Sequence, residues 1–249
     1  GPARERLLRE APSWFPCEIF CGGDNSAMLT GCWGASTAPA DHQNLWMWGS
    51  ERLTKTVETL VEGDQAEPRP QRRGFRFPVK AVAIGYRHCL AITTDGTMFS
   101  WGEGAQGQLG RAALQYQATP EPLPYPTDVI AIAAGEEHSA CISDGAQCFT
   151  WGAADGGRLG QGDSLVDGIQ MLPKMIELPQ NALGYATRLS SVACGSQHCA
   201  VITERKRLLT FGVGWFGRLG QGNLDNSYEP KFVDAPGLSA KTVHCAMYH

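Results

Sequence analysis

Short runs of apolar residues, separated by turn residues, dominate the chain from residue 79 onward. Residues 89–93 and 97–101 are two such runs, and Asp95-Gly96 lies between them. An Asp-Gly pair between two short apolar runs predicts a β-hairpin closed by a type I′ turn. The same pattern occurs twice more: residues 139–142 and 146–151 around Asp144-Gly145, and residues 199–203 and 208–211 around Arg205-Lys206.

In the second strand of each hairpin, large side chains alternate with small or polar ones. Phe99 and Trp101 therefore lie on one face of the predicted strand, and Met98 and Ser100 lie on the other. No long stretch keeps the helical period of 3.6 residues with capping residues at its ends. We therefore predict an all-β protein whose units pack face to face. Each unit contributes one aromatic core residue: Trp101, Trp151 and Phe211.

The hairpins are part of a longer repeat that occurs three times. Each unit has a glycine, then a histidine three residues later, and an aromatic residue sixteen residues after the glycine. A Gly-x-Leu-Gly element ends nine residues beyond the aromatic residue. The three histidines are His88, His138 and His198. Because this spacing is constant and the period is near fifty residues, the sequence predicts a repeat architecture.

The repeat continues more faintly at both ends. Ser26 takes the place of the histidine in a degenerate first repeat, and Val243–Ala246 with His249 starts a further unit. The predicted divisions are residues 1–16, a tag remnant and N-terminal segment; residues 17–50, the degenerate first repeat; residues 51–78, a basic proline-rich connection; and residues 79–249, which form one domain together with 17–50.

The order of these elements resembles the repeat of the regulator of chromosome condensation family. The resemblance rests on Ala-Gly-x-x-His, Asp-Gly, Trp-Gly and Gly-x-Leu-Gly, and it covers residues 79–249 well and 17–50 weakly. It implies a β-propeller, usually of seven blades, with each repeat split between neighbouring blades. A full ring would need roughly 350 residues, so these 249 residues predict an incomplete propeller of about four blades' worth. Open ends would expose strand edges, which favours self-association.

Charge and hydropathy narrow the expected partners. The net charge of −4 and the pI near 5.9 argue against broad binding to nucleic acid or chromatin. No run of eighteen apolar residues occurs, so we predict no membrane span and a cytoplasmic or nuclear protein. One basic segment is an exception, and it is either a solvated connection or a docking segment for an acidic partner or nucleic acid. Its arginines are Arg69, Arg72, Arg73 and Arg76.

Two loops match the G-x-G-x-x-G pattern of dinucleotide sites, residues 102–107 and 212–217. Such a site needs a helix that begins at the third glycine, and the sequence predicts no helix there. The recurring loops are therefore predicted to be propeller loops. No catalytic motif is present, so we predict no cofactor and no enzymatic activity.

The histidines and cysteines are predicted to be structural. Each histidine lies at one fixed place in its unit, which favours a hydrogen bond to a neighbouring backbone group. The nine cysteines are an odd number, so at least one thiol is unpaired. Two repeat positions exchange cysteine with small residues, which predicts small buried side chains and no metal site: Cys194 and Cys245 with Ala134, and Cys89 and Cys199 with Ser139. The group Cys17, Cys21, Cys32 and His42 has no recognisable zinc spacing.

These patterns favour a non-enzymatic module that binds a protein partner through loops on a rigid scaffold. We expect the turns between each repeat glycine and histidine, together with the glycine-rich loops, to form the binding rim. The candidate residues are Arg87, Glu136, Glu137, Gln197, Trp215, Phe216 and Arg218. The resemblance leaves two alternatives open. One is a guanine nucleotide exchange factor for a small GTPase, the activity of the founding member. The other is the propeller arm of a larger ubiquitin ligase or kinase.

Overall fold

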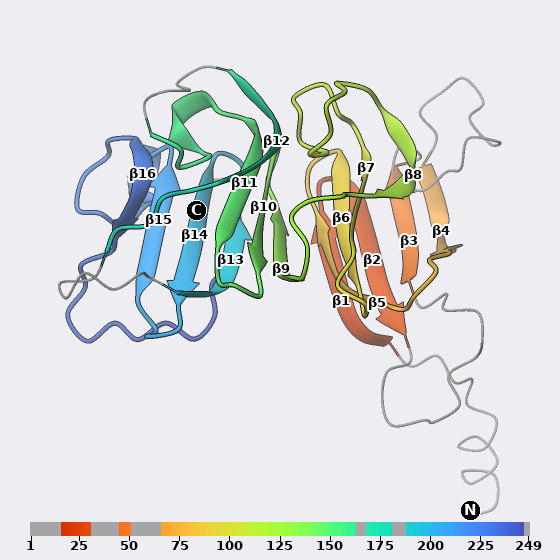
Figure 1. Ribbon diagram of the computed structural model, residues 1–249, viewed down its shortest axis with the longest axis horizontal. Helices are drawn as coiled ribbons and strands as arrows, with labels where there is room; N and C mark the ends of the chain where they lie inside the picture. The colour runs from red at the N-terminus through yellow and green to blue at the C-terminus, as the bar shows by residue number, and fades with distance from the viewer. Residues whose placement is uncertain (1–15, 31–44, 51–65, 163–167, 181–187, 247–249) are drawn as a thin grey trace, which may run out of the picture.

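The computed structural model describes residues 16–30, 45–50, 66–162, 168–180 and 188–246, and it shows four antiparallel sheets of four strands (Figure 1). We call these sheets blades 1 to 4. Blade 1 holds β1 (Pro16–Gly22), β2 (Asn25–Thr30), β3 (Leu45–Ser50) and β4 (Ala66–Arg73). Blade 2 holds β5 (Val79–Ile84), β6 (His88–Thr93), β7 (Met98–Gly102) and β8 (Gln117–Pro122).

The other two blades repeat this order. Blade 3 holds β9 (Val129–Ala134), β10 (His138–Ser143), β11 (Cys148–Ala153) and β12 (Ile169–Met175). Blade 4 holds β13 (Leu189–Cys194), β14 (His198–Thr203), β15 (Leu208–Gly212) and β16 (Ser227–Phe232). The helices of the described residues are two 3-10 turns, η2 (Asp155–Gly157) and η4 (Trp215–Gly217). The prediction of an all-β fold is confirmed.

Blade 1 differs from its prediction in two ways. Its fourth strand, β4, lies inside the stretch that was expected to be a connection, and it pairs with β3. Two prolines fit there because β4 is an edge strand, where a missing N–H breaks no ladder bond. The histidine position is also shifted by one residue. Asn25 pairs with Gly49 as His88 pairs with Gly102, so Asn25 rather than Ser26 occupies the histidine position.

The hairpin turns have the predicted location but a different conformation. A type I′ turn needs positive φ at two successive residues, whereas each turn here has one such residue: Gly96, Ala146 and Lys206, at φ 84, 57 and 63°. In the first hairpin, the N–H of Gly96 donates to the carbonyl of Thr93 at 2.9 Å. These are therefore three-residue connections, in which a type I turn precedes one left-handed residue. That geometry explains why the third turn needs no glycine at its centre.

The hydrophobic core consists of three layers, one in each gap between neighbouring blades. Leu90, Ile92 and Met98 pack across one gap against Phe149 and Trp151 of blade 3. The opposite face of blade 2 packs on blade 1, and the opposite face of blade 3 packs on blade 4. The middle blades are therefore buried on both faces, and β6 and β10 are buried along their whole length, as is β14 of blade 4. The three predicted aromatic core residues, Trp101, Trp151 and Phe211, are fully buried.

The blades approach most closely where the innermost strands end. Gly85, Gly135 and Gly195 follow β5, β9 and β13. Gly85 and Gly135 each face the carbonyl of the equivalent glycine in the next blade, and Gly195 faces the carbonyl of Ala246. A Cβ built on Gly135 would lie 2.5 Å from the carbonyl oxygen of Gly195 and 2.2 Å from Cε1 of His138. Only glycine allows this approach. The backbone N–H of Tyr86 also donates to the carbonyl of Gly135 at 3.2 Å, so the backbone itself joins blades 2 and 3.

The blades form an open arc. Neighbouring inner strands contact each other in the order β1, β5, β9, β13. The first and last described strands do not pair with each other, because β1 pairs with β2 and β16 pairs with β15. The prediction of an incomplete propeller of four blades' worth is confirmed. Among the described residues, no helix has the length and apolar character needed to cross a membrane.

The glycine contacts predict that Gly135→Ala destabilises the fold. The added methyl group overlaps the His138 ring and a backbone carbonyl, and such overpacking costs roughly 1–3 kcal/mol. Urea unfolding measures this loss. Gly145→Ala is the matched control, because its nearest neighbour would lie at 3.7 Å and its φ is not left-handed. Equal stability of the two variants would contradict the close approach.

Candidate functional site

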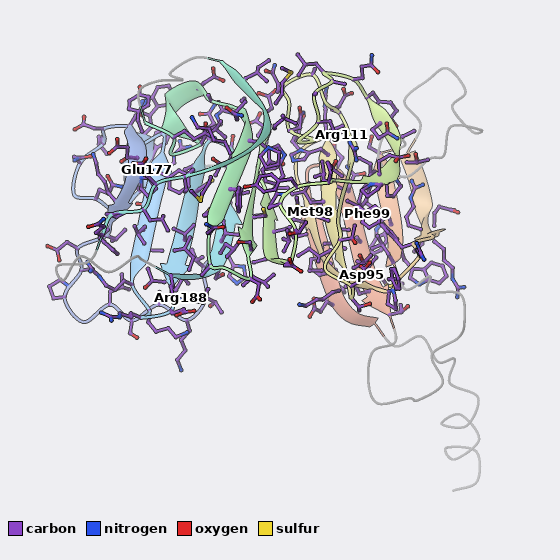
Figure 2. All side chains as sticks on the ribbon, viewed as in Figure 1. Asp95, Met98, Phe99, Arg111, Glu177 and Arg188 are labelled. Atoms are coloured by element: carbon purple, nitrogen blue, oxygen red, sulfur yellow. The ribbon has the colours of Figure 1, made fainter. Side chains whose placement is uncertain are left out.

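The two ends of the blades differ in character. The tight hairpin turns lie at one end, and the glycine-rich loops lie at the other, as Asp95 and Arg111 show for blade 2 (Figure 2). Each inner strand ends, each second strand begins and each third strand ends at the loop end, because neighbouring strands are antiparallel. We call this end the rim. It is formed by the Gly-x-x-His turns and the glycine-rich loops.

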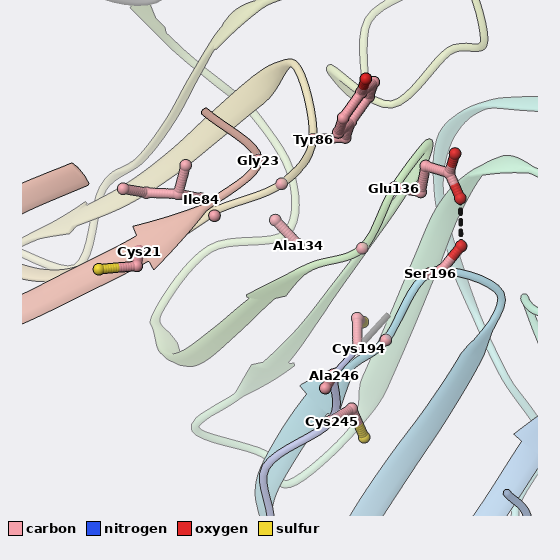
Figure 3. A pocket seen from close by; sticks show the side chains of 14 residues that line it. Cys21, Gly23, Ile84, Tyr86, Ala134, Glu136, Cys194, Ser196, Cys245 and Ala246 are labelled. Atoms are coloured by element: carbon pink, nitrogen blue, oxygen red, sulfur yellow. Dashed lines mark hydrogen bonds between the residues drawn. The ribbon is translucent and has the colours of Figure 1, made fainter. Parts of the chain in front are cut away.

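A pocket of about 260 Å³ opens where the Gly-x-x-His turns converge (Figure 3). Tyr86, Glu136 and Ser196 come from equivalent positions of blades 2, 3 and 4, and Cys194 and Cys245 also line it. The Ser196 hydroxyl donates a hydrogen bond to Oε2 of Glu136, which joins two neighbouring turns. The pocket therefore offers one carboxylate and one exposed aromatic ring to a partner group.

The pocket separates the predicted rim residues into two kinds. Glu136 lines it, whereas Arg87, Glu137 and Gln197 do not. These three residues instead use their backbone carbonyls, which accept hydrogen bonds at 2.8–2.9 Å from the backbone N–H groups of Glu103, Ala153 and Val213, at or just after the ends of β7, β11 and β15. Tyr86 and Ser196 lie in the turns that were expected to form the rim, although neither was named as a candidate residue. Their common signal is position, since each directly follows the repeat glycine.

Buried histidines connect the blades beneath the rim. Nε2 of His88 lies 2.8 Å from Oγ of Ser139 in the next blade, and that hydroxyl donates to the carbonyl of Gln108 at 2.8 Å. Because the serine proton is used in this way, Nε2 of His88 must carry the proton and donate it. The indole N–H of Trp151 donates to the same carbonyl at 2.8 Å. For His88, the predicted bond from histidine to backbone is therefore relayed by a side chain of the next blade.

The loop after β15 carries two exposed aromatic residues. Trp215 is 61% exposed and Phe216 is 81% exposed, which agrees with their choice as candidate rim residues. Phe216 has a left-handed backbone with φ 61°, at the position where blade 3 has Gly156 with φ 66°. Arg218 lies partly buried behind them, and its Nε donates to the carbonyl of Trp215 at 3.0 Å. Its guanidinium lies 5.8 Å from the Phe216 ring.

The basic segment is not one uniform surface. Arg73 is buried, so its predicted role in docking is wrong. Arg72 is exposed, and its guanidinium lies 4.6 Å from the centre of the Trp46 ring, a cation–π arrangement. Arg76 is exposed and lies 5.5 Å from the Phe77 ring. The side chain of Arg69 lies outside the described residues.

The cysteines largely follow their prediction. Cys89, Cys141, Cys148 and Cys199 are buried free thiols. Burial raises the pKa of the Cys89 thiol far above its ordinary value, which makes it a poor nucleophile. Cys32, His42 and His249 lie outside the described residues, and the Cys21 thiol is exposed.

The four blades, their repeated rim turns and their inter-blade histidines define a repeat protein of β-propeller type. The model described as "Regulator of chromosome condensation (RCC1) repeat" matches residues 95–142 and 146–202. A second model with the same description matches residues 79–108. Residues 79–142 and 146–202 therefore carry the repeat of this family.

Known proteins share this repeat at moderate identity. The X-linked retinitis pigmentosa GTPase regulator of Mus musculus is 36% identical over 215 residues, which cover 86% of this chain and 20% of that protein. The E3 ubiquitin-protein ligase HERC2 of Homo sapiens is 33% identical over 159 residues, which cover 63% of this chain and 2% of that protein. The chain thus spans a small part of either relative.

A solved structure supports the fold. Prp20p from Saccharomyces cerevisiae superposes with a TM-score of 0.73 at 22% identity, over 94% of this chain and 54% of Prp20p. At this identity the likeness shows the propeller fold alone.

The buried histidines predict that stability falls in mild acid. Burial lowers the pKa of His88 from 6.5 to about 4, and it lowers the pKa of His138 well below its ordinary value. Between about pH 6.5 and pH 4, the unfolded chain therefore binds protons that the folded chain does not, and the free energy of unfolding decreases as the pH falls. His88 alone contributes about 3 kcal/mol across this window.

Urea unfolding at several pH values measures this dependence. His88→Asn places asparagine where blade 1 already has Asn25. We expect this variant to be less stable than the wild type at pH 7, with a shallower loss of stability toward pH 4. An unchanged pH dependence would show that His88 is not the titrating group.

Proposed function

We propose that the chain is a non-catalytic protein-interaction module that binds its partner at the rim. The observation that carries this proposal is the pair Trp215 and Phe216 in η4. Large aromatic side chains in an exposed loop gain little from folding, and in known interfaces such residues are frequent anchors of binding. The match of the chain to a propeller repeat agrees with a rigid scaffold that holds recognition loops.

The backbone of Phe216 adds a second argument. A left-handed conformation costs an ordinary L-residue about 1–2 kcal/mol, and blade 3 avoids this cost with Gly156. Phe216 is 81% exposed, so little burial of its ring offsets the cost. Backbone strain that is not offset by burial of the side chain is typical of residues that take part in recognition.

The surroundings of η4 complete an apolar patch. Leu224 is 64% exposed, and its Cδ2 lies 3.9 Å from the position that a Cβ on Gly217 would take. We define the rim patch as Trp215, Phe216 and Leu224. The pocket with Glu136 opens at the same end of the blades, where its carboxylate suits a basic side chain of the partner. The proposed partner surface is therefore apolar with a basic projection.

The relatives support two narrower roles. One is named a GTPase regulator, which favours exchange activity on a small GTPase. Such activity needs no covalent chemistry, only tighter binding of the nucleotide-free GTPase. Another is a ubiquitin ligase, which favours a recognition arm within a larger protein.

The study of Prp20p concerns its binding to Gsp1p and histones, so chromatin remains an alternative partner. Location in the nucleus or cytoplasm stays a prediction.

Trp215→Ala and Phe216→Gly are expected to weaken partner binding without weakening the fold. Loss of an aromatic anchor costs about 2 kcal/mol, roughly a thirtyfold change in Kd. Glycine relieves the left-handed strain, which raises the free energy of unfolding, but it also gives the unfolded chain more conformational freedom, which lowers it. Phe216→Gly should therefore leave stability unchanged or raise it by up to about 1 kcal/mol. Partner proteins are first captured from cell extract with the wild-type chain and purified. Biolayer interferometry then measures the Kd of each variant for these partners.

The matched control for these variants is Leu172→Ser. Leu172 is 51% exposed but lies on β12 of blade 3, whereas η4 follows β15 of blade 4. It should bind every captured partner as the wild type does. Equal loss in the control, or a large fall in melting temperature for Trp215→Ala, would contradict the rim patch.

The exchange-factor role has its own test. Purified small GTPases loaded with a fluorescent GDP analogue are mixed with the chain, and nucleotide release is followed. The role predicts faster release from at least one GTPase, and slower exchange with Trp215→Ala. Unchanged release across the panel would reject exchange activity while leaving the interaction module intact.

A further inference from the structure

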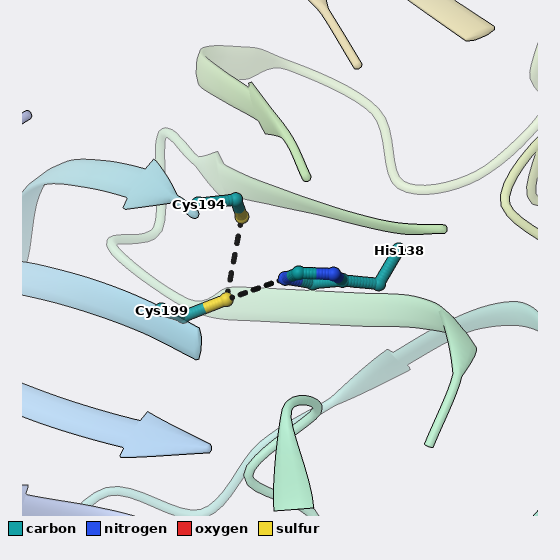
Figure 4. A group of neighbouring side chains, drawn as sticks. All are labelled: His138, Cys194 and Cys199. Carbon is teal, nitrogen blue, oxygen red and sulfur yellow. Dashed lines mark hydrogen bonds between the residues drawn. The ribbon is translucent and has the colours of Figure 1, made fainter. Parts of the chain in front are cut away.

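One cluster of side chains between blades 3 and 4 has no part in the proposed rim surface. Nε2 of His138 lies 3.2 Å from Sγ of Cys199, and that sulfur lies 3.3 Å from Sγ of Cys194 (Figure 4). All three ligand atoms lie within 4.8 Å of one another. In the part of the chain that the structure describes, this is the one such group of three histidine, cysteine or acidic residues.

The cluster arises from two substitutions at repeat positions. At the preceding interface, His88 faces Ser139, and Ala134 stands where blade 4 has Cys194. The scaffold is therefore the same at both interfaces, and only the one between blades 3 and 4 has two thiols beside the imidazole. Because Ser139 and Ala134 satisfy the same fold, stability alone does not require sulfur at these places.

We propose that His138, Cys194 and Cys199 bind a zinc ion. Zinc prefers thiolate and imidazole ligands in tetrahedral geometry, with Zn–S near 2.3 Å and Zn–N near 2.0 Å. These lengths place two tetrahedral sulfurs about 3.8 Å apart, so the cysteine pair needs to open by about 0.5 Å. Cys194 and Cys199 are directly paired residues of adjacent strands, which holds their side chains on one face.

Charge and access both fit zinc. Two thiolates cancel the charge of Zn²⁺, so the complex adds no net charge to a buried interface. Cys194 is the ligand that lines the central pocket, which gives an ion a path from solvent. Cys245 lines the same pocket, so a further thiol faces this path (Figure 3). The site is independent of the rim patch, and neither proposal depends on the other.

The test titrates Zn²⁺ into the purified, reduced and metal-free chain and measures stoichiometry by mass spectrometry of the native protein. We expect one zinc ion per chain and a higher melting temperature in its presence. The double variant Cys194→Ala with Cys199→Ser introduces the residues that blade 3 has at these positions, Ala134 and Ser139. We therefore expect it to fold. It should weaken zinc binding by more than about 100-fold, beyond the loss of an outer-shell partner, and show no thermal shift.

Cys89→Ser is the matched control, because Cys89 is buried at the same repeat position outside the cluster. It should retain the zinc ion and its thermal shift. Co²⁺ in place of zinc should give sulfur-to-metal charge-transfer absorption in the wild type and not in the double variant. Absence of zinc from the reduced wild type, or equal zinc binding by the double variant, overturns the site. A Cys194–Cys199 disulfide that persists under reductant also overturns it.

Discussion

The packing of blade 2 on blade 3, and of blade 3 on blade 4, depends on a buried, neutral imidazole. At the interface between blades 2 and 3, His88 donates to Ser139, which in turn donates to the carbonyl of Gln108. That carbonyl belongs to the Gly-x-Leu-Gly loop of the same blade as His88. One chain of bonds therefore fixes a strand, the neighbouring blade and a rim loop together. At the next interface His138 and Cys199 have the same arrangement, and Sγ of Cys199 lies 3.5 Å from the carbonyl of Arg158.

This arrangement explains how a rigid scaffold presents variable loops. The imidazole and the glycine three residues before it leave no room for other side chains, so both positions are constant in blades 2 to 4, whereas blade 1 has Asn25 in place of the histidine. The residues between them are free to vary, because the first projects into the pocket and the second contributes its backbone carbonyl. The rim loops vary in the same way: blade 3 has Asp155-Gly156 where blade 4 has Trp215-Phe216. Recognition can thus change while the inter-blade contacts persist.

Much of this fold follows from sequence because the repeat gives three independent views of one unit. The alternation of Phe99 and Trp101 with Met98 correctly assigned the two faces, since each strand face packs on a different neighbour. The exposure of Trp215 and Phe216 was also predictable from their polar or small counterparts. Blade 1 was harder, because a shift of one residue separates Asn25 from Ser26 and only strand pairing settles it.

Other features depend on contacts between distant units. The burial of Arg73 follows from the pairing of β4 with β3, which composition does not reveal in a basic, proline-rich stretch. The turn type depends on one backbone angle at Ala146 or Lys206 rather than on the Asp-Gly signal. The meeting of His138 with Cys194 and Cys199 requires two blades to be placed side by side, so position-by-position comparison of the repeats showed only small residues there.

A double-mutant cycle on His88 and Ser139 tests the inter-blade bond most directly. Urea unfolding at pH 7 would compare the wild type, His88→Asn, Ser139→Ala and the double variant. If the imidazole and the hydroxyl form one buried chain of bonds, the two changes are not additive, and their coupling energy is about 1 kcal/mol or more. Additive losses would show that the two side chains act independently, and would contradict the role of the imidazole in joining the blades.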